Sequence, residues 1–329
     1  MGQSMRILIA YDGSECAINA IEDLRRAGLP RNADVLVFAV DEILMPPPSS
    51  YEFAALPNHA ELLPRLRKAV ARSYERASQS LLAKRDLAHE GSHRLRSIFS
   101  EWRIFAEAVA GTPALEIVSR AHEWSADLVV VGSHGRSALG RLILGSVSHR
   151  VVNECRSSVR VARIREPFPD THRPPHLVIG FDGSAHSQQA VRAVANRTWP
   201  AGTRAHIVMA QKGADIIRVT DTPLATDVAT DRNEGEATTK LRISIEEAIK
   251  TLNATTHLEV ELRAIERDPK QALIRAAEEF DADCIFVGSR GESRGLFQKL
   301  LLGSVSTAVV NDAHCSVEVV HPMTKGVKV

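Results

Sequence analysis

Two clusters of glycine and serine have the composition of a phosphate-binding site. The first begins with Gly132 and Gly135 and continues, after nine residues, with Gly145-Ser146-Val147-Ser148. Glycines let backbone N–H groups approach a phosphate closely, because no side chain stands in the way. A helix that begins near Ser146 would add unpaired N–H groups and the positive end of its dipole. We therefore expect an anion to bind this segment, with Ser146 and Ser148 either capping the helix or contacting phosphate oxygens.

The same cluster occurs a second time, so the chain contains an internal duplication. Gly288 and Gly291 are followed, after eleven residues, by Gly303-Ser304-Val305-Ser306. Upstream, Asp182-Gly183-Ser184 repeats Asp12-Gly13-Ser14 at an offset of 170 residues, and ADCIFVGSRG repeats ADLVVVGSHG at an offset of 156. Blocks that recur in the same order indicate two copies of one domain.

Short apolar runs rich in Val and Ile alternate with helical patterns in each half, which is typical of a parallel sheet covered on both faces. The order predicts two tandem doubly wound α/β sandwiches of flavodoxin-like or Rossmann-like type. The stretch from about 54 to 102 is predicted to be mostly one long helix, which Gly91 could break. The predicted strands are RILIAY, VLVFAV, IFAEAVA, DLVVVG and SVRVARI, then HLVIGF, AHIVMA, HLEVELRAI, DCIFVG and SVEVVH.

The domain boundaries follow from the repeat and from proline. Residues 1–165 form the first predicted domain and residues 176–329 the second. Between them, residues 166–175 contain four prolines, which predicts an extended linker. The last strands of the halves, from Ser158 and from Ser316, would be exposed edges unless they pair. We expect them to pair within one chain, with a homodimer of whole chains as a further option.

The combined motifs identify a resemblance to a known family. Gly132-x2-Gly135-x9-Gly145-Ser146 resembles the ATP-binding pattern of the universal stress protein family, and the DGS and ADLVVVGSHG blocks also look like that family. The resemblance covers essentially the whole chain, taken twice. It implies a tandem protein that binds ATP, with Mg²⁺ as a bridging ion, and that regulates a stress response through its nucleotide-dependent conformation or partners.

The resemblance also implies a role for each matching residue in the first half. Asp12 would face the adenosine, and the Val40 backbone would hold the adenine edge. Gly132 would lie by the ribose. The phosphate contacts would come from the remaining residues of the motif, namely Gly135, Gly145, Ser146, Val147 and Ser148, with His134 and Arg136 beside them.

Each of these residues also has a purely structural explanation. Asp12 could cap the helix that follows it, Val40 could belong to the core, and the glycines could serve tight turns. His134 could be a solvated loop histidine. Sequence alone leaves both explanations open.

The second half departs from the pattern in two ways. Its corresponding residues are Asp182, Ala210, Gly288, Gly291, Gly303, Ser304, Val305 and Ser306. The loop before Gly303 is longer by two residues, and the insertion brings in Glu292, whose charge opposes phosphate binding. We therefore expect the second site to bind nucleotide more weakly than the first.

Composition excludes several function classes. A net charge of +1, from 41 basic and 40 acidic residues, does not favour a nucleic-acid partner. The sequence shows no membrane-length apolar run and no secretory signal, which predicts a cytoplasmic protein. The four cysteines fit no zinc pattern and are expected to be buried thiols, with an exposed redox-sensing thiol as the alternative.

No paired nucleophile and base appear, so no catalytic residue is predicted beyond slow ATP hydrolysis. Two other function classes stay open. One is an ATP-using enzyme of a related α/β superfamily, although YDGSECA lacks the glycine pair expected there. The other is a ligand-free dimerisation module, which the intact first motif opposes. Loops at 45–53 and about 213–235 could cover a ligand or be plain surface.

Overall fold

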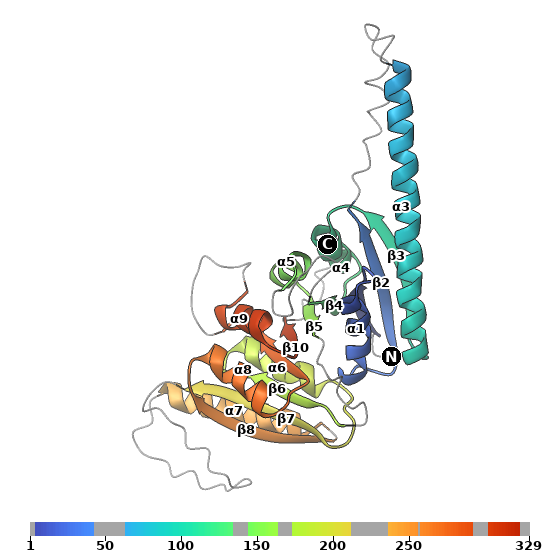
Figure 1. The fold of residues 1–329 in the computed structure, drawn as a ribbon. Helices are drawn as coiled ribbons and strands as arrows, with labels where there is room; N and C mark the ends of the chain where they lie inside the picture. The colour runs from blue at the N-terminus through green and yellow to red at the C-terminus, as the bar shows by residue number, and fades with distance from the viewer. Residues whose placement is uncertain are drawn as a thin grey trace.

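The structure is a computed structural model, and it describes residues 4–42, 63–133, 144–163, 173–211, 236–255, 257–291 and 302–322. Figure 1 shows two α/β halves lying side by side. The N-terminal half contains β1 (Met5–Ala10), α1 (Glu15–Asp23), η1 (Leu24–Arg26), β2 (Ala33–Asp41), α3 (Leu63–Ile98), β3 (Arg103–Ala110), α4 (Pro113–Glu123), β4 (Leu128–Gly132), α5 (Ser146–Glu154) and β5 (Ser158–Ala162).

The C-terminal half repeats this order of elements. It contains β6 (His176–Gly180), α6 (Ala185–Ala195), β7 (Thr203–Gln211), α7 (Glu236–Asn253), β8 (Leu258–Glu266), α8 (Pro269–Glu279), β9 (Cys284–Gly288), α9 (Ser304–Asp312) and β10 (Ser316–Val320). Every strand predicted from the apolar runs is present, and the helix expected near Ser146 begins at that residue. The α/β fold class and the duplication are confirmed.

The ten strands in the described part of the chain form one continuous sheet in the order β3-β2-β1-β4-β5-β10-β9-β6-β7-β8. Within each half the strands are parallel, as their alternation with helices requires. At the centre, β5 and β10 pair antiparallel, with Arg160 opposite Glu318. The expected pairing of the two edge strands within one chain is therefore confirmed, and it relates the halves by a pseudo-twofold axis.

Helices cover both faces of this sheet. On one face, buried residues of α4, α5, α8 and α9 form a single apolar cluster that runs across both halves. On the other face each half has its own cluster, under α1 and α3 in the N-terminal half and under α6 and α7 in the C-terminal half. The shared cluster and the continuous sheet hold the halves together as one body.

Helix α3 is one unbroken helix over Leu63–Ile98 and extends well past the sheet (Figure 1). Gly91 lies inside it, so the break considered at that position is wrong. A β-carbon at Gly91 would stand 3.0 Å from Val37 Cγ1 and 3.1 Å from Tyr11 Cδ1. The glycine therefore lets the helix pack closely against β2 and the loop after β1.

Several predictions fall outside the described residues. These are the loops at 45–53 and 213–235 and most of the linker, residues 166–172. No described helix is long and apolar enough to span a membrane. The four cysteines form no disulfide; Cys155, Cys284 and Cys315 are buried, and Cys16 is half-buried.

Candidate functional site

The loop after β1 holds Asp12 at the carboxyl edge of the sheet. Gly13 has a φ of 72°, which turns the chain sharply into α1. Asp12 Oδ1 accepts a hydrogen bond from the Ser14 amide at 2.9 Å, and Ser14 Oγ accepts one from the Ala17 amide at 3.2 Å. The N-cap of α1 is thus Ser14. Asp12 thus fixes the turn through one carboxylate oxygen, Oδ1.

The backbone of Val40 is positioned to contact a ligand. Successive strand residues direct their N–H and C=O groups to opposite sides. The Phe38 carbonyl accepts from the Tyr11 amide at 2.9 Å, so Phe38, and Val40 two residues later, face the β1 side. Strand β1 ends at Ala10, which pairs with Phe38. The polar backbone groups of Val40 therefore face the space beyond the end of β1, next to Asp12.

Gly132 has a packing role that its motif did not reveal. A β-carbon there would stand 3.0 Å from the backbone carbon and oxygen of Cys16. At Gly288 the equivalent distances, to the backbone carbon and oxygen of His186, are 2.5 and 2.6 Å. Both glycines let the first turn of a helix, α1 or α6, lie directly against the end of a strand. Close packing explains both residues without a ligand.

The start of α5 has the backbone geometry of a helix terminus that can accept an anion. Gly145 is the N-cap residue, and it has no side chain with which to cap the first-turn N–H groups. The Gly145 amide itself donates to the Ser133 carbonyl at 2.7 Å, which brings the two ends of the glycine loop together. First-turn N–H groups have no partner within the helix, and together with the helix dipole they favour a negative group at this point. The start of α9 at Gly303 has the same geometry.

The two serines of the first motif, Ser146 and Ser148, have different roles in the structure. Ser146 is exposed at the first position of α5, where its hydroxyl can reach a ligand. Ser148 is buried, and its hydroxyl donates to the Gly132 carbonyl at 2.6 Å. Ser306 makes the equivalent bond to Gly288 at 2.7 Å. Neither Ser146 nor Ser148 caps the helix, since that position belongs to Gly145. Val147 and Val305 are partly buried against the shared apolar cluster.

The centre of the first glycine loop, with His134, Gly135 and Arg136, lies outside the described residues, as does Glu292. In the second loop Gly291 is described. A β-carbon on it would stand 2.9 Å from Asp182 Oδ2. The loops after β6 and β9 therefore meet, as expected if Asp182 and the glycine loop surround one ligand.

Asp182 also repeats the turn of Asp12, with Oδ1 accepting from the Ser184 amide at 3.0 Å. Ala210 faces the space beyond β6, because the Val208 carbonyl accepts from the Phe181 amide.

The structure places one more buried acidic residue, Asp41, at the carboxyl end of β2, which the sequence motifs did not single out. It is 5% exposed at the end of β2, and its Oδ2 has no hydrogen-bond partner in the described part of the chain. An acidic residue that directly follows an apolar strand run is a signal for this position.

The sequence motifs also did not single out two histidines of the second half, His186 and His321, whose pKa values are lowered in the fold. His321 follows β10, and burial, with Arg290 and His186 nearby, lowers its pKa to about 4. Burial and Arg290 also lower the pKa of His186. At neutral pH both imidazoles are uncharged. A histidine just past the last strand run would have been the signal for His321.

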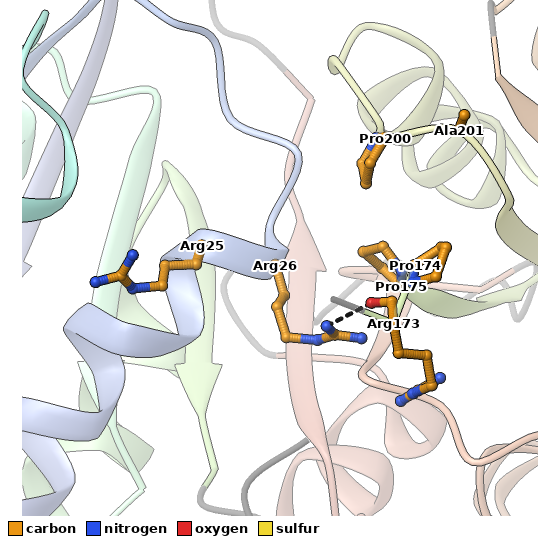
Figure 2. A pocket seen from close by; sticks show the side chains of 7 residues that line it. All are labelled: Arg25, Arg26, Arg173, Pro174, Pro175, Pro200 and Ala201. Carbon is orange, nitrogen blue, oxygen red and sulfur yellow. Dashed lines mark hydrogen bonds between the residues drawn. The ribbon is translucent and has the colours of Figure 1, made fainter. Parts of the chain in front are cut away.

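A pocket of about 260 Å³ lies elsewhere, where the two halves meet at the amino ends of the strands. Arg25, Arg26, Arg173 and the prolines at 174, 175 and 200 line it (Figure 2). The figure shows Arg25 extending away from the prolines and Arg26 reaching toward the Arg173 carbonyl. Arg25 pairs with Glu22, and both Arg26 and Arg173 pair with Asp283. The pair between Arg26 of the N-terminal half and Asp283 of the C-terminal half makes these side chains part of the interface between the halves.

Comparisons with known proteins agree with this architecture. The profile of the "Universal stress protein family" matches residues 4–163 and again 175–321. Universal stress protein Rv1996 of Mycobacterium tuberculosis is 27% identical over 323 residues, which span 95% of this chain and 94% of the relative.

Two solved structures are also similar. A universal stress protein from Archaeoglobus fulgidus aligns with a TM-score of 0.58 and 21% identity. The alignment covers 97% of this chain and 99% of the Archaeoglobus chain. A universal stress protein in complex with cAMP matches 45% of this chain and 97% of its own, with a TM-score of 0.31 and 23% identity. The family profile matches nearly the whole length in two copies. The chain therefore belongs to the universal stress protein family, as a tandem member with two family domains.

Proposed function

We propose that the N-terminal half binds ATP at the carboxyl edge of β1, β2 and β4. In this proposal the chain is a regulatory stress-response protein whose nucleotide state sets its conformation or its choice of partner. The observation that carries the proposal is the open start of α5 at Gly145. It supplies first-turn N–H groups for phosphate without a competing cap.

Neighbouring groups support an adenosine nucleotide. Strands β2, β1 and β4 are adjacent in the sheet, so their carboxyl ends adjoin. Val40 presents a backbone donor and acceptor there, which suits the edge of an adenine ring. Asp12 presents a carboxylate oxygen, which suits a ribose hydroxyl. Base, sugar and phosphate would thus each have a matching group at this edge of the sheet, and Mg²⁺ would accompany the phosphates.

The second half is proposed to bind nucleotide more weakly. It keeps the open helix start at Gly303 and the turn at Asp182. Its loop is longer and contains Glu292. The Asp182 carboxylate also lies directly against Gly291. Because Asp182 repeats Asp12, the difference in charge between the two motifs is the added carboxylate of Glu292, which would raise the cost of binding a triphosphate unless a cation intervenes. We propose no catalytic residue in either half.

The test is to identify the ligand that the purified full-length chain retains. The protein would be purified without added nucleotide and denatured, and the released compounds analysed by mass spectrometry. We expect ATP at close to one equivalent per chain. A thermal shift series with ATP, ADP and cAMP in the presence of Mg²⁺ would follow, because a ligand that binds only the folded state raises Tm. Ligand-free protein whose Tm does not respond to any of these nucleotides would favour a dimerisation module instead.

A further inference from the structure

The interface between the two halves is symmetric in its backbone and asymmetric in its side chains. The Arg163 amide donates to Ser316 Oγ at 3.1 Å, and the His321 amide donates to Ser158 Oγ at 3.3 Å. These two bonds are related by the pseudo-twofold axis and would form equally well between two identical halves. Any preference for unlike halves must therefore come from other side chains.

The first asymmetry is a row of four charges at the axis. Arg160 and Glu318 occupy equivalent positions in β5 and β10 and face each other across the axis. Arg160 Nη1 lies 3.3 Å from Glu318 Oε2, and these side chains are 0% and 1% exposed. Asp23 contacts Arg160 at 2.6 Å on one side, and Arg197 pairs with Glu318 on the other.

The order of these charges depends on which halves meet. In this chain it is Asp23, Arg160, Glu318, Arg197, so the signs alternate. Two N-terminal halves would instead place Arg160 against a second Arg160, and two C-terminal halves would place Glu318 against a second Glu318. Each half contributes one positive and one negative charge to this row, so within the row only the Arg160–Glu318 contact changes to a like-charge contact when two identical halves meet. Because that contact is fully buried, a like-charge arrangement there is costly.

The second asymmetry is steric. Gly28 lies under the indole of Trp199, where a β-carbon at 28 would stand 2.7 Å from Cε3. The repeat aligns Gly28 with Thr198 and Ala27 with Arg197. Arg197 Nη1 donates to the Ala27 carbonyl at 2.8 Å. A large side chain in one half thus meets a small residue in the other, and this match is lost when two identical halves meet.

From these observations we infer that the edge surface of the N-terminal half, formed by β5 with α1 and η1, is built to accept a C-terminal half and to reject a second copy of itself. The occupant is the C-terminal half of the same chain type. The row of four charges and the Trp199–Gly28 contact select it. Edge-to-edge pairing of two N-terminal halves, or of two C-terminal halves, is thereby disfavoured.

The test inverts the charges of one half at a time in the full-length chain. One variant combines Asp23→Arg with Arg160→Glu, a second combines Glu318→Arg with Arg197→Glu, and a third carries all four changes. Each half keeps its internal pair in every variant. Either single inversion places like charges at the axis, so we expect the unfolding equilibrium constant in urea to rise about 100-fold or more. Inverting both halves restores the alternating signs. We therefore expect the unfolding equilibrium constant of the fourfold variant to be at least about tenfold lower than the product of the two single effects predicts. Strictly additive effects would overturn the inference.

A milder cycle covers the case in which an inverted chain does not fold. Arg160→Met leaves Asp23 without its partner, Glu318→Met leaves Arg197 without its partner, and either change alone also removes the Arg160–Glu318 contact. In the double variant that shared contact is lost only once. We expect the double variant to be more stable than the sum of the single losses predicts. Equal stability of all four proteins would overturn the inference.

Partner choice is measured by co-expression. The two half-inverted chains, with different tags, can exchange halves so that both interfaces alternate in sign. We expect them to co-purify as a mixed dimer, and to capture the wild-type chain at least about tenfold less. Equal capture of both would contradict the selection of unlike halves.

Discussion

The hydroxyl of Ser148 donates to the carbonyl of Gly132 at 2.6 Å and ties the first turn of α5 to the end of β4. Ser306 and Gly288 repeat this bond in the C-terminal half. The bond sets where the helix starts relative to the strand, and with it the position of the first-turn N–H groups.

Removing this hydroxyl should reduce stability more than it reduces nucleotide affinity. Ser148→Ala leaves a carbonyl without its donor at a buried site, which costs about 1–3 kcal/mol. Ser306→Ala should cost a similar amount, and urea unfolding of both variants measures it. A Ser148→Ala chain that unfolds like wild type but no longer binds ATP would show that the hydroxyl serves the ligand instead.

Gly288→Ala should be more destabilising than Gly132→Ala. The new methyl group would stand 2.5 Å from the His186 backbone in the first case and 3.0 Å from the Cys16 backbone in the second. Backbone atoms cannot move aside as a side chain can, and overpacking of this kind costs about 1–3 kcal/mol or more. Thermal unfolding of the two variants ranks them. The reverse order would mean that α6 shifts more easily than α1.

Asp12→Asn should weaken ATP binding without loosening the fold. The amide oxygen can still accept from the Ser14 amide, so the turn is kept, whereas the charge that would hold a ribose hydroxyl is lost. We expect about a tenfold rise in Kd, which corresponds to about 1.4 kcal/mol. Asp182→Asn is the matched control and should change the overall affinity less. Titration calorimetry provides both values, and a larger effect at Asp182 would reverse our ranking of the sites.

Stability should fall as pH is lowered from about 7 toward 4, in part because of His321. Its pKa drops from 6.5 to about 4 on folding, so the unfolded chain binds more protons within that window. Stability from this group is therefore complete above pH 6.5 and is lost as the pH falls to 4, by up to about 3 kcal/mol. His321→Gln should flatten the dependence of the unfolding free energy on pH between these values. An unchanged slope would place the proton uptake elsewhere.

Apolar runs and alternation predicted the ten strands, because the inner parallel strands are nearly continuous apolar segments, whereas the edge strand β8 alternates polar with apolar residues. The pairing of β5 with β10 was also predictable, since both would otherwise be open edges. Gly91 was misjudged because its low helix propensity is outweighed by close packing against Val37 and Tyr11.

The site was less predictable than the fold. Motif spacing predicted the helix start at Ser146, yet it could not separate Ser146, exposed at the helix start, from Ser148, whose hydroxyl is used within the fold. Nor could it show that Gly132 is required by the backbone of Cys16, over 100 residues away in sequence. Such roles depend on distances between elements that local sequence does not specify. The alternating charges of Arg160 and Glu318 likewise become visible only when the two strands are paired.

The most direct test of nucleotide binding in the N-terminal half is calorimetric titration of the Gly145→Asp chain with ATP and Mg²⁺. Gly145 has a φ of −63°, which any residue can adopt, and aspartate is a favourable N-cap residue. The substitution should therefore preserve or raise stability while its carboxylate takes the first-turn N–H groups and repels phosphate. We predict that Gly145→Asp abolishes the tight binding event, and that the matched Gly303→Asp chain retains it. Unchanged ATP affinity in a folded Gly145→Asp chain would contradict the account.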